Sequence, residues 1–168
     1  MQLDLPRPQF LGTLPAGEAG TRATLRVMRD LVRRYKRADP IRRTALELTA
    51  ALQPKNWMQE VRAVFSFVRD RIRYTRDVRG VETVQTPIAT LELEQGDCDD
   101  KATLLAALLE SIGHPTRFVA VGYRSPTEFS HVYVETRIGP RWIGLDATMP
   151  YEVGWTPPLG LARMIVYN

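Results

Sequence analysis

Through most of the first two thirds of the chain, apolar side chains recur every three or four residues. This spacing is that of one face of an α-helix, and it predicts helices over residues 21–38, 40–52, 57–72 and 98–112. Thr21 is placed to cap the first helix, and Asp39-Pro40 separates the first helix from the second. Residues 73–91 lack a sustained period and are predicted to be irregular or extended, with Pro87 as one of the breaks.

Apolar and polar positions alternate in the last third of the chain, which is the period of a β-strand. The alternation predicts strands over residues 118–123, 131–138 and 141–145, with a shorter strand at 164–167. Gly139-Pro140 is predicted to be a tight turn that joins the second and third strands into a hairpin. Helices that precede an antiparallel sheet indicate an α+β fold rather than an alternating βαβ order.

The composition is that of one folded domain, with 168 residues of which 44% are hydrophobic and 25% are charged. Three prolines and three glycines among the first 20 residues predict an extended N-terminal arm over 1–20, ahead of a single domain over 21–168. No run approaches the roughly 18 apolar residues of a membrane span. The N-terminus also lacks the pattern of a signal peptide. We therefore expect a cytoplasmic protein that does not associate with a membrane.

The net charge of +4 is unevenly distributed along the chain. Residues 22–43 carry a net charge of +7, and the other residues together carry −3. Such a stripe is either a solvated helix face or a surface for an acidic partner. Apart from Tyr35, no aromatic residue lies among the basic ones, and no nucleic-acid-binding motif accompanies them, so a nucleic-acid partner is not expected. The residues that we expect to contact an acidic protein partner are Arg26, Arg33, Arg34 and Arg37.

The chain contains a single cysteine, Cys98, so it forms no intramolecular disulfide and no cysteine-cluster metal site, and we expect no metal or cofactor. Cys98 begins a predicted helix, where Asp97 can act as N-cap and Asp100 can complete a capping box. The N–H groups and dipole of a helix start favour a thiolate and could receive an oxyanion. Three carboxylates beside the sulfur, Asp97, Asp99 and Asp100, raise the pKa of a thiol, so a catalytic role requires a nearby histidine.

Two histidines are available. His114 follows the helix that Cys98 begins, and a helix of about 15 residues places it roughly 22 Å away. His131 begins a predicted strand instead. If Ile138 pairs with Arg141 across the turn, His131 and Asp146 share a face of the hairpin as diagonal neighbours. Cys98, His131 and Asp146 can then act as nucleophile, base and orienting carboxylate. The alternatives are an inert buried thiol, a structural histidine and an aspartate that only shapes a turn.

Three blocks of residues are similar to one known family. Gly96–Asp100, followed by Leu104–Leu109 and Gly113, resembles the nucleophile helix of the transglutaminase-like superfamily. His131–Glu135 and Trp142–Thr148 resemble its histidine and aspartate strands, and the similarity extends over residues 81–149. The resemblance implies a papain-like α+β core, with N-terminal helices over 21–75 and a catalytic core over 81–150 in which a nucleophile helix packs on an antiparallel sheet.

The resemblance also implies roles for individual residues. In such a Cys-His-Asp triad, Cys98 attacks a carbonyl or carboxamide, His131 exchanges protons and Asp146 orients the imidazole. Gln85 is the candidate side-chain donor to the oxyanion, and Tyr133 and Trp142 are candidates to line the cleft.

Three functions remain open from the sequence. The first is a thiol hydrolase that cleaves peptide or amide bonds of a protein or peptide substrate through a cysteinyl thioester. The second is a transglutaminase that transfers the acyl group to an amine. The third is a non-catalytic scaffold of bacterial or phage assembly that uses its basic helices. The compact chain looks most like small bacterial or phage-encoded members of the family.

Overall fold

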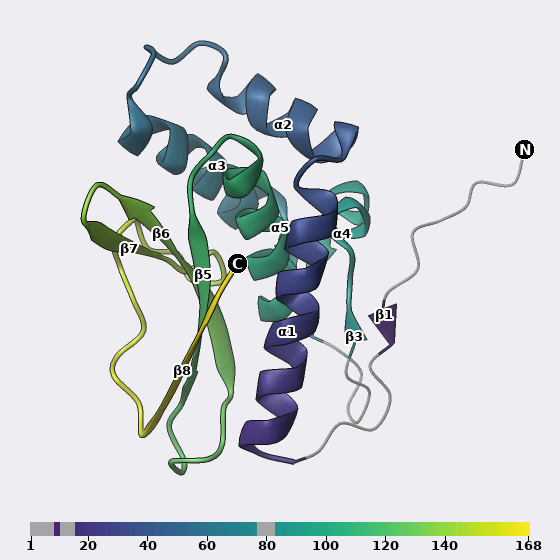
Figure 1. Ribbon diagram of the computed structural model, residues 1–168, viewed down its shortest axis with the longest axis vertical. Helices are drawn as coiled ribbons and strands as arrows, with labels where there is room; N and C mark the ends of the chain where they lie inside the picture. The colour runs from purple at the N-terminus through teal and green to yellow at the C-terminus, as the bar shows by residue number, and fades with distance from the viewer. Residues whose placement is uncertain (1–8, 11–15, 77–82) are drawn as a thin grey trace, which may run out of the picture.

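A computed structural model of the chain describes residues 9–10, 16–76 and 83–168. Five helices, one four-stranded sheet and two two-stranded sheets are present in these ranges (Figure 1). The helices are α1 (Glu18–Tyr35), α2 (Asp39–Thr49), α3 (Trp57–Arg71), α4 (Pro87–Leu93) and α5 (Cys98–Ser111).

Helix α1 begins earlier than the sequence pattern predicts. Its N-cap is Gly17, and the N–H and hydroxyl of Thr21 both donate to the Gly17 carbonyl, so the prediction of Thr21 as the cap is wrong. Glu18 starts the helix and pairs with Arg22 at 2.8 Å, an i,i+4 contact that supports the additional turn. The end of the predicted arm over 1–20 is therefore helical, and residues 1–8 and 11–15 of that arm lie outside the described residues.

Helix α4 corrects the prediction that residues 73–91 are irregular or extended, because the end of this segment is helical. The Thr86 hydroxyl accepts the Ala89 N–H at 3.2 Å, and Pro87 occupies the first turn, where its missing N–H costs nothing. The prediction treated Pro87 as a break, although a threonine followed by proline is also a helix start. Short strands flank the helix. Strand β2 (Arg73–Tyr74) pairs with β4 (Gln95–Gly96), and β1 (Gln9–Phe10) pairs with β3 (Thr83–Val84).

A four-stranded antiparallel sheet has the order β7-β6-β5-β8. Its strands are β5 (Thr116–Gly122), β6 (His131–Ile138), β7 (Arg141–Leu145) and β8 (Ala162–Tyr167). β6 and β7 have the predicted bounds, whereas β5 and β8 each begin two residues before the prediction. Ile138 pairs with Arg141 and Val134 with Leu145, so the predicted register of the hairpin is confirmed.

Helix α5 is the central element of the core. All of its residues from Ala102 to Leu109 are buried, because the sheet packs on one side and the other helices surround the rest (Figure 1). Val132 and Val134 belong to this core, whereas Tyr133 points to the other face of the sheet. The α+β prediction is thus confirmed. No helix within the described ranges is long and apolar enough to span a bilayer.

Candidate active site

The first turn of α5 carries Cys98 within the predicted capping box, which the structure confirms. The Asp97 side chain accepts the N–H groups of Asp99 and Asp100 at 2.9 and 3.1 Å, and the Asp100 carboxylate accepts the Asp97 N–H at 3.2 Å. Gly96 makes this packing fit, because a Cβ at that position would lie 2.5 Å from the Asp100 Cβ. The cap therefore occupies two N–H groups of the helix start.

Asp100 also connects this helix start to a distant segment. Its Oδ1 accepts the backbone N–H of Gln85 at 2.7 Å, and its side chain is almost fully buried. The Gln85 side-chain oxygen accepts a hydrogen bond from the Thr90 hydroxyl at 3.5 Å. The structure thus brings the Gln85 backbone to the start of the helix that carries Cys98. The role of its side chain as an oxyanion donor stays a prediction.

The environment of the Cys98 sulfur favours the protonated thiol. Burial raises the pKa of the thiol well above its ordinary value, and the charges of Asp99 and Asp97 raise this pKa further. Sγ lies 3.6 Å from Asp99 Oδ1. The backbone N–H of Val132 acts in the opposite direction and lowers the pKa, since it hydrogen-bonds to the sulfur. The carboxylates of Asp97 and Asp100 are directed into the capping box, so Asp99 is the acidic side chain that contacts the thiol.

His131 and Asp146 meet as the hairpin register predicts. His131 Nε2 lies 2.6 Å from Asp146 Oδ2. The other Asp146 oxygen accepts the N–H and hydroxyl of Thr148 at 3.0 and 2.6 Å. Burial of Asp146 alone would raise its pKa, but the hydrogen bond and charge of His131, with the two donors of Thr148, lower the pKa below its ordinary value. The imidazole therefore lies beside an ionised, fully hydrogen-bonded carboxylate.

The sulfur of Cys98 lies against the beginning of β6, because Val132 directly follows His131 in that strand. Among the described residues, no hydrogen bond joins Sγ to the imidazole. The ring binds Asp146 through Nε2, which leaves Nδ1 as the nitrogen that can accept a proton. His114 contacts Glu60 at 2.8 Å, beyond the far end of α5 from Cys98, as its position in the sequence predicts.

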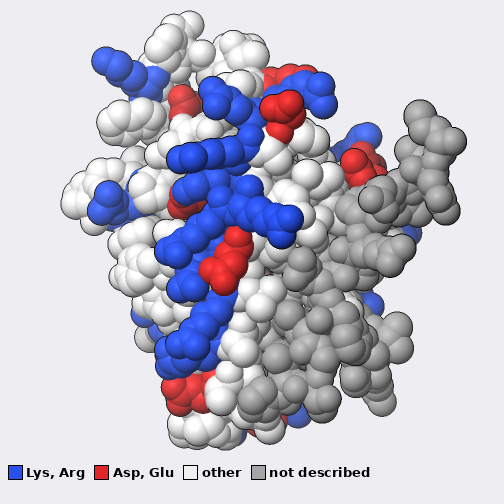
Figure 2. Space-filling model, turned by 45° about the vertical axis from the view of Figure 1, so that its right-hand side comes forward, with Lys and Arg blue, Asp and Glu red and all other residues white. Residues whose placement is uncertain are grey.

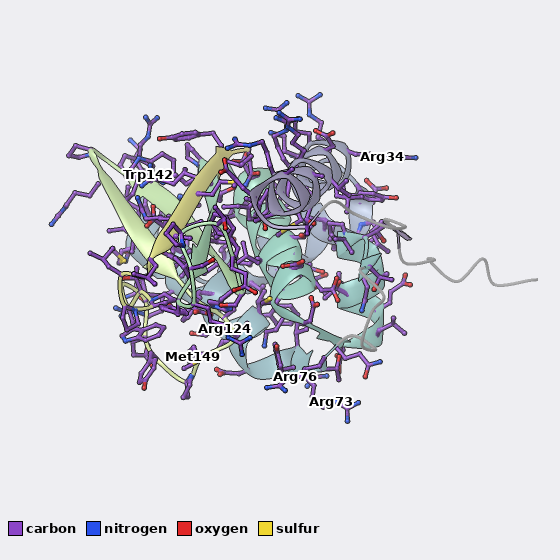
Figure 3. All side chains as sticks on the ribbon, turned by 90° about the horizontal axis from the view of Figure 1, so that it is seen from below. Arg34, Arg73, Arg76, Arg124, Trp142 and Met149 are labelled. Atoms are coloured by element: carbon purple, nitrogen blue, oxygen red, sulfur yellow. The ribbon has the colours of Figure 1, made fainter. Side chains whose placement is uncertain are left out.

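Tyr133 and Trp142 have their contacts on the outer face of the sheet. Tyr133 is buried with Val119 and Val121, and its hydroxyl lies 3.4 Å from Glu135. The Trp142 ring packs edge-on against Tyr167, with the Arg117 guanidinium 4.2 Å from its centroid. Figure 3 shows Trp142 well apart from Arg124 and Met149. These contacts do not bring either ring to Cys98, and their predicted roles in a cleft gain no support from them.

A pocket of about 500 Å³ adjoins the site and was not predicted from the sequence. It lies between the segment from Arg69 to Tyr74 and the segment from Ala147 to Glu152. Lys101 and Thr148 line it, and both were missed. Lys101 had a signal, since it is the only basic residue of a helix whose following residues are mostly apolar. Thr148 follows Asp146 by two residues, a spacing at which a threonine bonds an aspartate side chain.

The predicted basic stripe begins on α1 and continues through Lys36 and Arg37 into α2. Figure 2 shows a band of arginine and lysine with a few acidic residues within it on one face of the molecule. Arg22 is paired with Glu18 and Arg29 with Asp30. Figure 3 shows Arg34 of α1 on the opposite side of the molecule from Arg73, Arg76, Arg124 and Met149. Among the described residues, the members of the stripe that form no ion pair are Arg26, Arg33, Arg34, Arg37, Arg42 and Arg43.

A cysteine starts the central buried helix, and the paired histidine and aspartate lie at the start of β6 and directly after β7, which is the α+β arrangement that the sequence resemblance implies. Residues 42–147 match the family model of the transglutaminase-like superfamily, and the chain belongs to that superfamily. The match begins at residue 42, well before the resemblance over 81–149 that the sequence blocks indicate. Within the described residues, no three histidine, cysteine, aspartate or glutamate side chains gather in a way that could hold a metal ion.

Solved structures show the same fold at low sequence identity. A putative protease from Parabacteroides distasonis aligns with a TM-score of 0.62 at 16% identity, covering 76% of this chain and 26% of that chain. A putative cysteine protease from Cytophaga hutchinsonii aligns with a TM-score of 0.55 at 21% identity, covering 84% of this chain and 52% of that one. The chain thus spans about a quarter and about half of these two proteins. No curated protein matches the chain.

Proposed function

We propose that this protein is a thiol hydrolase that cleaves a peptide or amide bond through a cysteinyl thioester on Cys98. The observation that carries the proposal is the 2.6 Å contact between His131 and Asp146, with the Cys98 sulfur against the next residue of the same strand. The names of the two structural neighbours, a putative protease and a putative cysteine protease, support the same class of reaction.

The raised pKa of Cys98 determines how the nucleophile is activated. Because the resting sulfur is a thiol, His131 Nδ1 takes its proton as Sγ attacks the carbonyl carbon of the substrate. Asp146 keeps Nε2 protonated and stabilises the imidazolium that forms. The leaving amine receives this proton as its bond to carbon breaks, which leaves the thioester. Water then attacks the thioester with His131 as base, releasing a carboxylic acid and restoring the thiol.

We propose two donors for the oxyanion. The cap occupies the N–H groups of Asp99 and Asp100, whereas the Cys98 N–H makes no hydrogen bond among the described residues. The second donor is the side-chain NH₂ of Gln85, whose oxygen faces Thr90 and whose backbone Asp100 holds at the helix start. Two N–H donors directed at one oxygen form the usual oxyanion hole of acyl transfer.

The experiment compares the wild-type protein with Cys98→Ala and Asp146→Asn on glutamine-containing peptides. New amino termini, ammonia release and incorporation of a labelled amine are measured in parallel. We expect hydrolysis products that require Cys98, and a loss in kcat of about 10⁴-fold for Asp146→Asn, as for other triads in which this change alters the tautomer of the histidine. Hydrolysis by Cys98→Ala at the wild-type rate would refute the proposal. Amine incorporation in excess of hydrolysis would instead assign a transglutaminase.

The basic stripe favours a second function, the docking of an acidic protein on α1. Arg26 and Arg33 are exposed on α1, seven residues apart, and Arg37 is exposed in the turn that follows this helix. Glu18 at the start of α1 and Asp30 within the stripe interrupt the positive charge, which disfavours a continuous phosphate backbone and favours an acidic polypeptide. Capture experiments with Arg26→Glu/Arg33→Glu/Arg37→Glu against wild type, using polyglutamate and duplex DNA as probes, test this. Salt-sensitive binding of polyglutamate that the triple variant loses supports the docking role, and equal binding by both proteins contradicts it.

A further inference from the structure

The pocket beside the candidate active site contacts three parts of the proposed machinery. Tyr74 lines it, and the phenol of this residue is close enough to Cys98 and Asp97 for their charges to raise its pKa, after the larger effect of burial. Thr148 lines it and donates two hydrogen bonds to Asp146. Lys101 lies on α5, one turn after Cys98. A group bound in this pocket would therefore lie next to the bond that Cys98 attacks.

Lys101 is a buried cation with an unused donor. Its residue is 2% exposed, and Nζ donates to the carbonyls of Ile72 at 2.6 Å and Arg69 at 3.2 Å. An ammonium has three donors, so one N–H is left without an acceptor among the described residues. Burial lowers the pKa of Lys101 to about 8, while the charges of Asp70 and Asp146 act in the opposite direction. At neutral pH the side chain is therefore still mostly protonated.

The other charges on the pocket wall leave it with an excess of positive charge. Two carboxylates, Asp70 and Glu152, line it, and both of them bind Arg69. The guanidinium of Arg73 instead donates to the neutral side-chain oxygen of Gln95 at 2.7 Å. Within the described residues, no carboxylate lies within ion-pair distance of Arg73 or Lys101. Figure 3 shows Arg73 and Met149, both from this pocket, on the same side of the molecule as Arg76 and Arg124.

From these observations, and resting on the proposed function for the identity of the scissile bond, we propose that the pocket binds a carboxylate of the peptide substrate. The buried ammonium of Lys101 and the guanidinium of Arg73 are the groups that hold it. The volume of about 500 Å³ is within the range of about 300–1,000 Å³ that is usual for ligand pockets. The apolar residues Met149 and Pro150 provide a wall for the hydrocarbon part of the same residue. The carboxylate is either an acidic side chain or a chain terminus, since both present the same group.

The test measures how well short peptides slow the alkylation of Cys98 by iodoacetamide at pH 7.5, followed by mass spectrometry. The single cysteine of the chain makes the labelling unambiguous. The probes are acetyl-Ala-Glu-Ala-amide and its glutamine isostere for a side-chain acid. Acetyl-Ala-Ala with a free carboxylate, and its amide, test a terminal acid. We expect an acid to give half-maximal protection at a concentration about tenfold lower than its neutral isostere, as for one charge-assisted hydrogen bond.

Arg73→Gln should remove most of this preference, and Arg141→Gln, a matched change at an exposed arginine at the start of β7, should retain it. Lys101→Met should remove it as well, and a circular dichroism spectrum establishes whether that buried variant folds. Protection by only one of the two acids identifies whether a side-chain or a terminal carboxylate binds. Protection by both shows that a carboxylate is sufficient for binding, wherever it lies in the peptide. Equal protection by acids and isosteres, or a preference that survives in Arg73→Gln, overturns the proposal.

Failure of this proposal and failure of the proposed function give different results. Alkylation requires only that iodoacetamide reaches Cys98 and that a fraction of the thiol is ionised, whereas cleavage of the same peptides requires the whole mechanism. Acid-selective protection without cleavage would leave the pocket assigned and would remove the hydrolase. Cleavage that depends on Cys98 but shows no acid preference would retain the hydrolase and remove the carboxylate pocket.

Discussion

Gly96→Ala is the substitution that most directly tests how the start of α5 is built. A Cβ at this position would lie 2.5 Å from Asp100 Cβ, 3.0 Å from Oδ2 and 3.2 Å from Cγ. Carbon atoms in contact are normally about 3.5–4.0 Å apart, so Asp100 must move by about 1 Å. Its carboxylate holds the N–H groups of Asp97 and Gln85, and a displacement of this size removes both hydrogen bonds.

The cost follows from those two bonds. Loss of the capping contact costs about 1 kcal/mol. Loss of the hydrogen bond from the Gln85 N–H to a charged acceptor costs about 1.5–3 kcal/mol. Replacing glycine by alanine restricts the unfolded chain and returns about 0.4–1 kcal/mol. We therefore expect Gly96→Ala to lower the free energy of unfolding by about 2–3 kcal/mol, which is large against the total stability of a domain of this size.

Urea denaturation measures the change in stability, and amide hydrogen exchange at Gln85 and Asp97 identifies its cause. The control is Gly113→Ala, where φ is +93° and an added Cβ meets nothing within 4 Å. That variant should lose about 1–2 kcal/mol through backbone strain alone, with both amides still protected. A Gly96→Ala protein as stable as wild type, or a destabilised one in which Gln85 and Asp97 exchange at wild-type rates, would refute the reasoning.

Three other changes have effects that follow from the charges of Asp146, Asp99 and Arg117. The pKa of Asp146 lies below its ordinary value of 3.8 in the folded protein, so its carboxylate stabilises the fold above that pH and this contribution is lost as the pH falls through the lowered pKa. The difference between wild type and Asp146→Asn in urea unfolding should accordingly be full at pH 5 and above and should decrease towards pH 2. A difference that stays constant down to pH 2 would contradict this. Because the pKa of Cys98 is raised by burial and then by Asp99, the rate of its alkylation by iodoacetamide should still be increasing above about pH 9, the upper end of the ordinary range for a thiol. Asp99→Asn should displace this profile to lower pH, and a rate that levels off near neutral pH would show a preformed thiolate instead. Arg117 binds Glu135 at 2.7 Å and covers the Trp142 ring. Arg117→Met should therefore lower the free energy of unfolding, measured by heat or urea, by about 2–4 kcal/mol. A loss within about 0.5 kcal/mol, which is that of an ordinary surface change, would show that the two contacts are not stabilising.

Local patterns predicted the parts of the site that depend on local geometry. The alternation through residues 131–145 and the two-residue turn at Gly139-Pro140 determine the register of the hairpin, and the register determines that His131 meets Asp146. The spacing of Asp97 and Asp100 likewise predicted the capping box. In both cases the partners are close in sequence or are connected by one turn, so the backbone period alone fixes their relative positions.

Contacts between distant segments had no such signal. Gln85 and Asp100 are separated by 15 residues and by α4, a helix that the sequence pattern did not predict. The position of the Cys98 sulfur at Val132 depends on how α5 docks against the sheet, which is a property of core packing and not of any motif. Trp142 illustrates the same point, because its stacking with Tyr167 and Arg117 follows from the pairing of β8 beside β5, which the sequence did not specify.

The protonated resting state of Cys98 bears on how the protein withstands oxidation. Peroxides oxidise thiolates to sulfenic acid far more readily than they oxidise thiols. A sulfenic acid is normally rescued by a second cysteine, and this chain has only one, so further oxidation would proceed to forms that are not reversed. Burial and the neighbouring carboxylates keep the sulfur in the less reactive form, and in the mechanism that we propose it is ionised only when His131 takes its proton. The same charges that slow the nucleophile thus extend its chemical lifetime.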